Sequence, residues 1–395
     1  MRNEILPSGL KGLLIRLRPV ISVFDGPFMG MLLALMALSC LIVYSAGSDF
    51  DGRFADHLRN LVLALIITWA VAHVQPTQLE KIAPALFALG VLLLLAVAVA
   101  GETSKGAQRW LNIGFTRIQP SELMKIAMPL MLAWLASRYG GLTTIRHWAM
   151  AVILLGIPSL LILKQPDLGT ALLVIASGMF VLYFAGLSWK LVIAAGVLLA
   201  IGVLGLIFFG DAACANGISW PGLHEYQRQR VCMLLDPMRD PLGKGFHIIQ
   251  SVIAVGSGGL FGKGWMQGTQ TQLEFIPERT TDFIFAAYSE EFGLLGNILL
   301  IALYSGLVLR GLWIAIGAPT LFSRLVAGAL SLTIFVYAFV NLGMVTGILP
   351  VVGVPLPWMS YGGTAMVTLG LGVGILMSIS RTRSQTVQSF VLQRQ

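Results

Sequence analysis

The amino-acid sequence predicts an all-α polytopic membrane protein with ten transmembrane helices and one long extracytoplasmic loop between spans 7 and 8. Of its 395 residues, 56% are apolar and only 11% are charged, whereas soluble domains carry about 25% charged residues. A chain of this composition lacks the polar surface that a soluble fold requires. The third observation is a series of apolar segments near the length of roughly 20 residues that crosses a bilayer. These segments cover about residues 27–47, 58–74, 83–101, 121–137, 148–164, 169–187, 190–209, 292–312, 323–347 and 362–380.

The distribution of basic residues predicts the orientation of these spans. With the N-terminus inside, the inner segments hold thirteen Lys or Arg residues and the short outer loops hold six. Because basic residues collect in cytoplasmic loops, both termini are expected in the cytoplasm. The first apolar run has no small-residue cleavage site behind it, so it is expected to be a retained span rather than a signal peptide. The net charge of +8 follows from this topology, and nucleic acid is not an expected partner.

The whole chain, 1–395, is interpreted as a single membrane domain, and its longest connection is the outer loop at 210–291. The stretch "HIIQSVIAVGSGGLFGKG" at 247–264 is apolar but short and broken by glycine, which favours a re-entrant or interfacial segment over an eleventh span. The three cysteines have no metal-site spacing. Cys214 and Cys232 both fall in the outer loop, where oxidising conditions permit a disulfide that their spacing does not require.

The first of three outward-facing polar clusters is "KGAQRWLNIG" at 105–114, where Lys105 and Arg109 accompany Trp110. Cations at headgroup height suit a lipid-linked phosphate, because an Arg side chain can bind phosphate oxygens with two parallel hydrogen bonds. Ordinary anchoring at the membrane interface explains the same residues equally well.

The second cluster is "IQPSELMKIA" at 118–127, where Glu122 and Lys125 stand three residues apart at a helix start. That spacing places both on one helix face, where they can neutralise each other inside the bilayer. A structural ion pair is favoured over a catalytic one, although intramembrane charges often mark function. Asp167, two residues before Gly169, is expected to cap the next helix.

The third cluster is "QLEFIPERTTDFIFA" at 272–286, which leads through Asp282 into apolar sequence. We expect a short interfacial helix over 282–291 before the eighth span. A carboxylate in such partly desolvated surroundings is suited to accept a proton, while the alternative is a helix-capping Asp in an exposed loop. The sequence contains no Walker loop, no HExxH and no ligand set that demands a metal.

The stretch "NLGMVTGILPVVGVPLPWMSYGG" at 341–363 resembles the signature of the SEDS family (shape, elongation, division and sporulation). The stretches "GAQRWL", "QPSE", "QPDLGTA" and "PERTTDFIFA" extend the resemblance from residue 106 to residue 363. The run "QGTQTQLEFIPERTTDFIFA" is more similar to the rod-shape-determining branch of the family than to the division branch. Family members often have His where this chain has Thr280, which weakens any role proposed for that His.

The resemblance implies a peptidoglycan glycosyltransferase of the bacterial plasma membrane that polymerises lipid II with inversion during cell elongation. It implies a class B penicillin-binding protein and other elongation-complex membrane proteins as partners. By resemblance, Asp282 is the essential aspartate, and Glu122 and Lys125 occupy the family's intramembrane ion pair. Cations expected to stabilise the departing pyrophosphate are Lys105 and Arg109, with Arg228 and Arg230 as further candidates, and a divalent ion such as Mg²⁺ could share that task.

Two other functions remain open at this point. A lipid II flippase would also have ten spans and intramembrane charges, but it would need no base at Asp282. A scaffold that only recruits a penicillin-binding protein would leave Asp282 replaceable.

Overall fold

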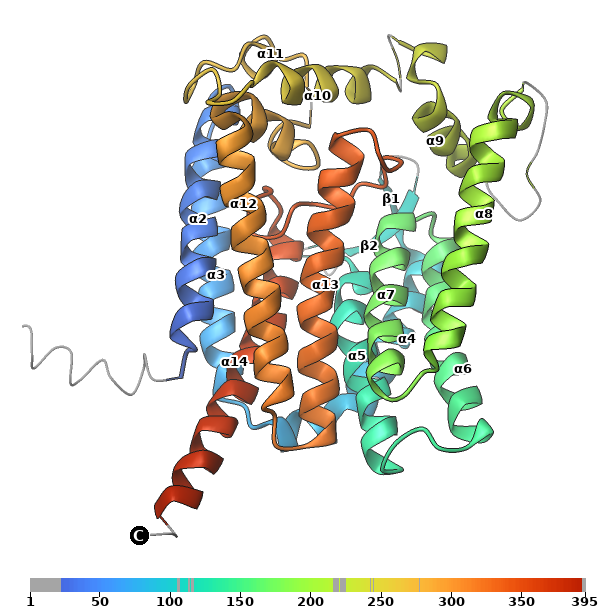
Figure 1. Cartoon of the computed structure of the whole chain (residues 1–395), viewed down its shortest axis with the longest axis vertical. Coiled ribbons are helices and arrows are strands. Elements are labelled where there is room, and N and C mark those ends of the chain that lie inside the picture. The colour runs from blue at the N-terminus through green and yellow to red at the C-terminus, as the bar shows by residue number, and fades with distance from the viewer. Residues whose placement is uncertain are drawn as a thin grey trace, which may run out of the picture.

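Long helices dominate the computed structural model of the chain (Figure 1). It describes residues 23–392 except 105, 106, 113, 115, 116, 216–219, 221–224, 242, 244 and 277. The long helices are α2 (Gly26–Ala46), α3 (Arg53–Ala72), α4 (Pro76–Ala100), α5 (Pro120–Arg138), α6 (Ile145–Lys164), α7 (Leu168–Phe184), α8 (Trp189–Ala213), α12 (Ile284–Ile316), α13 (Leu321–Val345) and α14 (Gly363–Leu392).

The fold class is confirmed, because eight of these helices are long and apolar enough to cross a membrane. The other two are α5, which carries the charges of Glu122 and Lys125, and α7, which has 17 residues. Both coincide with expected spans, but the count of ten stays a prediction.

The helices differ in how far they are buried within the bundle. Helices α5, α13 and α14 lie near its centre, and α14 packs closely on α3 while α13 packs on α12, α7 and α5. Helix α8 stands at the edge in Figure 1, and no residue of its span Trp189–Gly210 is buried except Gly210. Most of α8 therefore presents its surface to lipid rather than to the rest of the chain.

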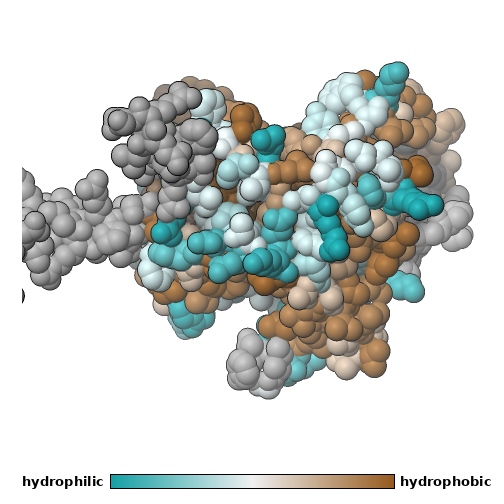
Figure 2. All heavy atoms as spheres, turned by 90° about the horizontal axis from the view of Figure 1, so that it is seen from below, coloured by the Kyte–Doolittle hydropathy of each residue, from teal (hydrophilic) through white to brown (hydrophobic). Residues whose placement is uncertain are grey.

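The start of α2 and the end of α14 lie at the same end of the bundle, at the bottom of Figure 1. Viewed from below, this end has a band of hydrophilic side chains with hydrophobic ones beside it (Figure 2). The helix ends gathered there carry basic residues, among them Arg138 of α5, Arg146 of α6 and Arg324 of α13. This arrangement agrees with the inner loops that the positive-inside rule predicts.

The opposite end is covered by the long loop and by a small antiparallel sheet. The sheet has the order β1 (Glu102–Ser104), β2 (Ala107–Asn112), β3 (Arg117–Ile118). The loop contains α9 (Glu225–Leu235), the 3-10 turn η1 (Pro237–Arg239), α10 (Phe246–Ser257) and α11 (Thr269–Gln272). Helix α10 lies across the upper end of the bundle in Figure 1 and packs on α12.

The glycine-rich segment 258–264 supplies hydrogen-bond acceptors at a break in helix α12. Gly293 has φ 63° and ψ −159°, a backbone conformation that interrupts the helix and is essentially restricted to glycine. The N–H groups of Leu294 and Leu295 instead donate to the carbonyls of Gly259 and Leu260, at 2.9 and 3.2 Å. A Cβ on Gly293 would lie 2.3 Å from the Gly262 nitrogen, so the close approach of these two segments requires glycine.

Candidate active site

A cavity of about 430 Å³ brings the three polar clusters of the sequence together. Arg109 and Trp110 come from β2, Glu122 and Lys125 from α5, and Asp282 from the turn before α12. The remaining wall comes from the start of α7 and from the segment 353–365. Residues separated by more than 240 positions thus face one polar space, and Asp282 is partly exposed in it.

The turn that carries Asp282 is held by side chains and backbone from α13 and the segment 351–362. Asn341 is fully buried in α13, and its Nδ2 donates to the carbonyls of Asp282 and Val354, both at 2.8 Å. Ser360 Oγ donates to the Thr281 carbonyl at 2.7 Å, and the Tyr361 N–H donates to the Thr280 carbonyl at 2.8 Å. These bonds fix the backbone on both sides of the Asp282 carboxylate.

Two unusual backbone positions lie in the segment that supplies this wall, one at Gly353, which lines the cavity, and one at Trp358, which does not. Gly353 has φ 73°, and a Cβ there would lie 3.3 Å from Asp282 Oδ2. Trp358 has φ 63° although it is bulky and fully buried. Backbone strain of this kind persists only where the surrounding structure over-determines it, and it concentrates at functional sites.

Glu122 and Lys125 form the expected ion pair, with Lys125 Nζ 2.5 Å from Glu122 Oε1. The two residues are only 9% and 3% exposed. Lys125 Nζ also lies 5.0 Å from the centre of the Tyr337 ring, on α13. The pair therefore ties α5 to α13 at the floor of the cavity while both charges remain part of its lining.

Arg109 lies against the cap of α7. Asp167 Oδ1 accepts from the Thr170 N–H at 3.2 Å, which confirms the expected helix-capping role. Its Oδ2 accepts from Gln119 Nε2 at 2.9 Å and lies 3.9 Å from Arg109 Nε. Arg109 also donates to the Pro166 carbonyl. The Arg109 guanidinium is therefore held in the cavity wall by one carboxylate, that of Asp167. The same carboxylate also accepts hydrogen bonds from Gln119 and Thr170.

The other expected cations are not brought to this cavity. Lys105 lies outside the described residues. Arg228 lines a different hollow beside the top of α8, where its Nη1 donates to the Ala215 carbonyl at 3.3 Å. Arg230, on the same short helix α9, is not among the residues that line the cavity around Asp282.

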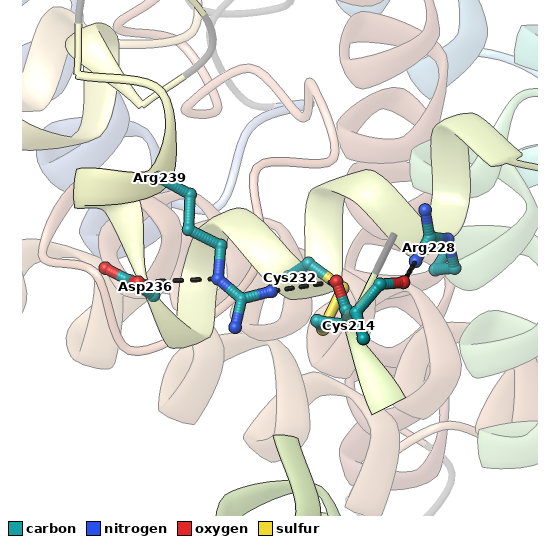
Figure 3. The surroundings of a disulfide bond; sticks show 6 residues. Cys214, Arg228, Cys232, Asp236 and Arg239 are labelled. Atoms are coloured by element: carbon teal, nitrogen blue, oxygen red, sulfur yellow. Dashed lines mark hydrogen bonds and ion pairs between the residues drawn. A yellow bond between two sulfur atoms is a disulfide. The ribbon is translucent and has the colours of Figure 1, made fainter. Parts of the chain in front are cut away.

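The hollow beside α8 is organised by a disulfide between Cys214 and Cys232 (Figure 3). Arg239 reaches from η1 between Asp236 and the Cys214 carbonyl, to which its Nη1 donates at 2.9 Å. The disulfide and the two arginines together join the upper end of α8 to the outer loop.

Sequence reasoning missed Asn341, Ser360 and Tyr361 as individual contributors to the site, although all three fall in the quoted stretch 341–363. A signal for Asn341 was available, because an amide within an otherwise apolar span needs internal hydrogen-bond partners. The roles of Ser360 and Tyr361 depend on contacts with a turn about 80 residues away, which no local pattern encodes.

The arrangement suits proton abstraction next to a departing anion. The Asp282 carboxylate can accept a proton from a hydroxyl, and the guanidinium of Arg109 can stabilise negative charge in the same space. Within the described part of the chain, no group of three or more His, Cys, Asp or Glu side chains is arranged to hold a metal ion.

These features define a polytopic membrane protein with a carboxylate and cations in one cavity. Residues 24–385 match the family model of the FtsW, RodA and SpoVE cell cycle proteins. The chain therefore belongs to this family, which is the SEDS family that the sequence motifs indicated.

Two curated relatives illustrate the range of the family. Over 365 residues the chain is 50% identical to peptidoglycan glycosyltransferase MrdB of Escherichia coli (strain K12), covering 92% of this chain and 95% of the relative. It is 35% identical over 361 residues to stage V sporulation protein E of Bacillus subtilis (strain 168), covering 88% and 94%.

Solved structures agree with the fold. A chain from a structure described as a peptidoglycan synthase complex that coordinates polymerization and crosslinking superposes with a TM-score of 0.73 at 32% identity, covering 92% of this chain and 99% of that chain. The rod shape determining protein RodA of Thermus thermophilus superposes with a TM-score of 0.67 at 26% identity, covering 91% and 97%.

Proposed function

We propose that the chain is a peptidoglycan glycosyltransferase that polymerises lipid II into glycan strands, with Asp282 as its general base. The observation that carries the proposal is the shared cavity of Asp282 and Arg109, in a chain half of whose aligned residues are identical to those of a peptidoglycan glycosyltransferase. The cavity offers a proton acceptor and an anion-stabilising group within one space.

In the proposed reaction, Asp282 takes the proton from an acceptor sugar hydroxyl. The hydroxyl oxygen forms a bond with the anomeric carbon of the donor, and the bond from that carbon to the pyrophosphate oxygen breaks with inversion. The pyrophosphate leaves with the bonding electron pair, and Arg109 stabilises its charge. Asp282 then releases the proton to water.

The polyprenyl tails of both substrates require that the cavity be reached from the membrane. We place the cavity on the extracytoplasmic side of a bacterial plasma membrane, with both termini in the cytoplasm, because the basic helix ends lie at the opposite end of the bundle. A class B penicillin-binding protein is the proposed partner. The similarity to a chain described as part of a peptidoglycan synthase complex supports this assignment.

We also propose that a divalent cation such as Mg²⁺ binds the departing pyrophosphate and shares the stabilisation of its charge. Hard cations prefer oxygen ligands, and the carboxylates of Glu278 and Asp282 both line the cavity. Removal of divalent ions with a chelator, followed by readdition of Mg²⁺, tests this part separately.

The substitution Asp282→Asn tests the general base. Asn keeps the size of the side chain but cannot accept a proton at neutral pH, so we expect polymerisation of labelled lipid II by the purified complex to fall roughly 100-fold or more. Asp51→Asn, at an exposed position between α2 and α3, is the matched control and should keep normal rates. A near-normal rate for Asp282→Asn, in a protein that folds and binds its partner, would refute the catalytic assignment.

A further inference from the structure

We propose that Arg53 binds the second pyrophosphate at this site, that of the acceptor lipid. The inference rests on the proposed function, because a polymerase that joins two polyprenyl-pyrophosphate-linked substrates must accommodate two such groups around one base. Arg109 accounts for the departing one. The acceptor keeps its pyrophosphate throughout the reaction, so a separate cation is needed at a place where that group can remain bound.

The contacts of Arg53 place it next to the turn that carries Asp282. Arg53 begins α3, and its Nη1 donates to Thr280 Oγ1 at 2.6 Å, two residues before Asp282. Its guanidinium carbon lies 5.3 Å from the centre of the Tyr361 ring, and Tyr361 lines the cavity. Arg53 is not itself part of the cavity lining but lies directly behind it on the α3 side, in contact with Tyr361, whereas Arg109 lines the cavity from β2, next to α7.

The charge of Arg53 is not neutralised by the carboxylates around it. Asp49 pairs with Arg279 at 2.7 Å, and Asp56 pairs with Arg59 at 3.0 Å. Across the described residues, no carboxylate forms an ion pair with Arg53. Its guanidinium is half-buried and stacks 3.7 Å from the centre of the Phe50 ring. A cation held in place by aromatic rings, with N–H groups beyond the one given to Thr280, is suited to phosphate oxygens.

An aromatic cluster beside Arg53 is of the kind that lies at the height of lipid headgroups. Tyr44 of α2 packs edge-on against Phe54, with ring centres 5.3 Å apart, and stacks on Trp265 at 5.8 Å. Tyr44 and Trp265 are 48% and 45% exposed. Exposed Trp and Tyr residues are typical of the membrane–water interface. A lipid that approaches along α2 and α3, which lie side by side in Figure 1, would bring its pyrophosphate to Arg53.

The two cations should have different kinetic signatures. Arg53 contacts a group that is unchanged by the reaction, so its loss should raise the KM for lipid II and leave kcat nearly unchanged. Arg109 contacts a group whose charge grows in the transition state, so its loss should lower kcat.

A binding experiment tests Arg53 without any turnover. Purified proteins that are wild type, Arg53→Gln or Arg59→Gln at these positions all carry Arg109→Gln, which removes the cation assigned to the departing group. They are titrated with polyprenyl pyrophosphate, which is unreactive, and with the uncharged polyprenol. Arg59→Gln is the matched control, because this substitution removes the same charge from an exposed position on the same helix. We expect Arg53→Gln to weaken pyrophosphate binding about tenfold or more, as for a lost charge-assisted hydrogen bond. Polyprenol binding, and both titrations of Arg59→Gln, should match wild type.

Pyrophosphate affinity of Arg53→Gln equal to wild type would overturn the proposal. So would an equal loss of polyprenol binding, because that would indicate a disturbed fold rather than a lost anion contact. Arg53→Lys keeps the charge without the planar fork and should recover part of the affinity. If the wild-type protein does not polymerise lipid II, the proposed function is wrong. The binding difference between Arg53→Gln and Arg59→Gln can still be measured, because it requires no turnover, so the two failures are distinguishable.

Discussion

Neutralising one member of the Glu122–Lys125 pair should destabilise the protein more than neutralising both. At an effective dielectric constant of about 20, unit charges separated by the observed 2.5 Å attract each other by about 7 kcal/mol. The cost of removing both charges from water offsets much of that attraction. A single substitution leaves the remaining charge buried and unpaired, which costs about 3–5 kcal/mol.

The assay is a double-mutant cycle on the free energy of unfolding in mixed detergent micelles. Glu122→Gln and Lys125→Met preserve side-chain size, so each removes a charge without opening a large cavity. We expect each single variant to lose about 3–5 kcal/mol and the double variant to lose less than either.

Asp56 and Arg59 provide the matched control, because they also stand three residues apart and lie 3.0 Å from each other. Their side chains are 43% and 72% exposed, so their coupling should stay below about 1 kcal/mol. Equal coupling energies for the two pairs would show that Glu122 and Lys125 are hydrated in the membrane, and would refute this reasoning.

Two further predictions concern the outer loop and the cavity wall. In intact cells a thiol reagent should label neither Cys214 nor Cys232 until a reductant is added. The variant Cys214→Ser should make Cys232 reactive without a reductant. Labelling of both cysteines in unreduced wild type would contradict the disulfide. Gly353→Ala should lower the polymerisation rate roughly tenfold, because relieving about 1–2 kcal/mol of left-handed strain moves the wall that faces Asp282. Gly30→Ala, where a Cβ meets open space on α2, should keep the normal rate.

The sequence predicted the helices well because membrane insertion makes hydropathy a direct signal of structure. The expected span 27–47 corresponds to Gly26–Ala46, and the expected ion pair on α5 forms as its spacing indicated. The start of α12 was predicted less well. The expected helix over 282–291 begins at Ile284 and runs to the break at Gly293, and that break depends on backbone bonds from 259–260.

The site was only partly predictable for a related reason. Asp282, Glu122 and Arg109 carry charge in apolar surroundings, so composition alone drew attention to them. Their convergence in one cavity depends on tertiary packing. Arg228 was also expected at the site, but it does not reach this cavity. The disulfide and contacts with α8 set the path of the long outer loop, which places Arg228 in a different hollow. The hydrogen bonds of Asn341 to Asp282 and Val354 likewise connect segments that no periodic pattern relates.

The most direct test of the central claim is to supply labelled lipid II to liposomes that contain the purified chain and a class B penicillin-binding protein whose transpeptidase site is blocked. We expect glycan polymers that a muramidase digests, formed by wild type and absent with Asp282→Asn. Transfer of labelled lipid II between leaflets without any polymer, at equal rates in wild type and Asp282→Asn, would contradict it.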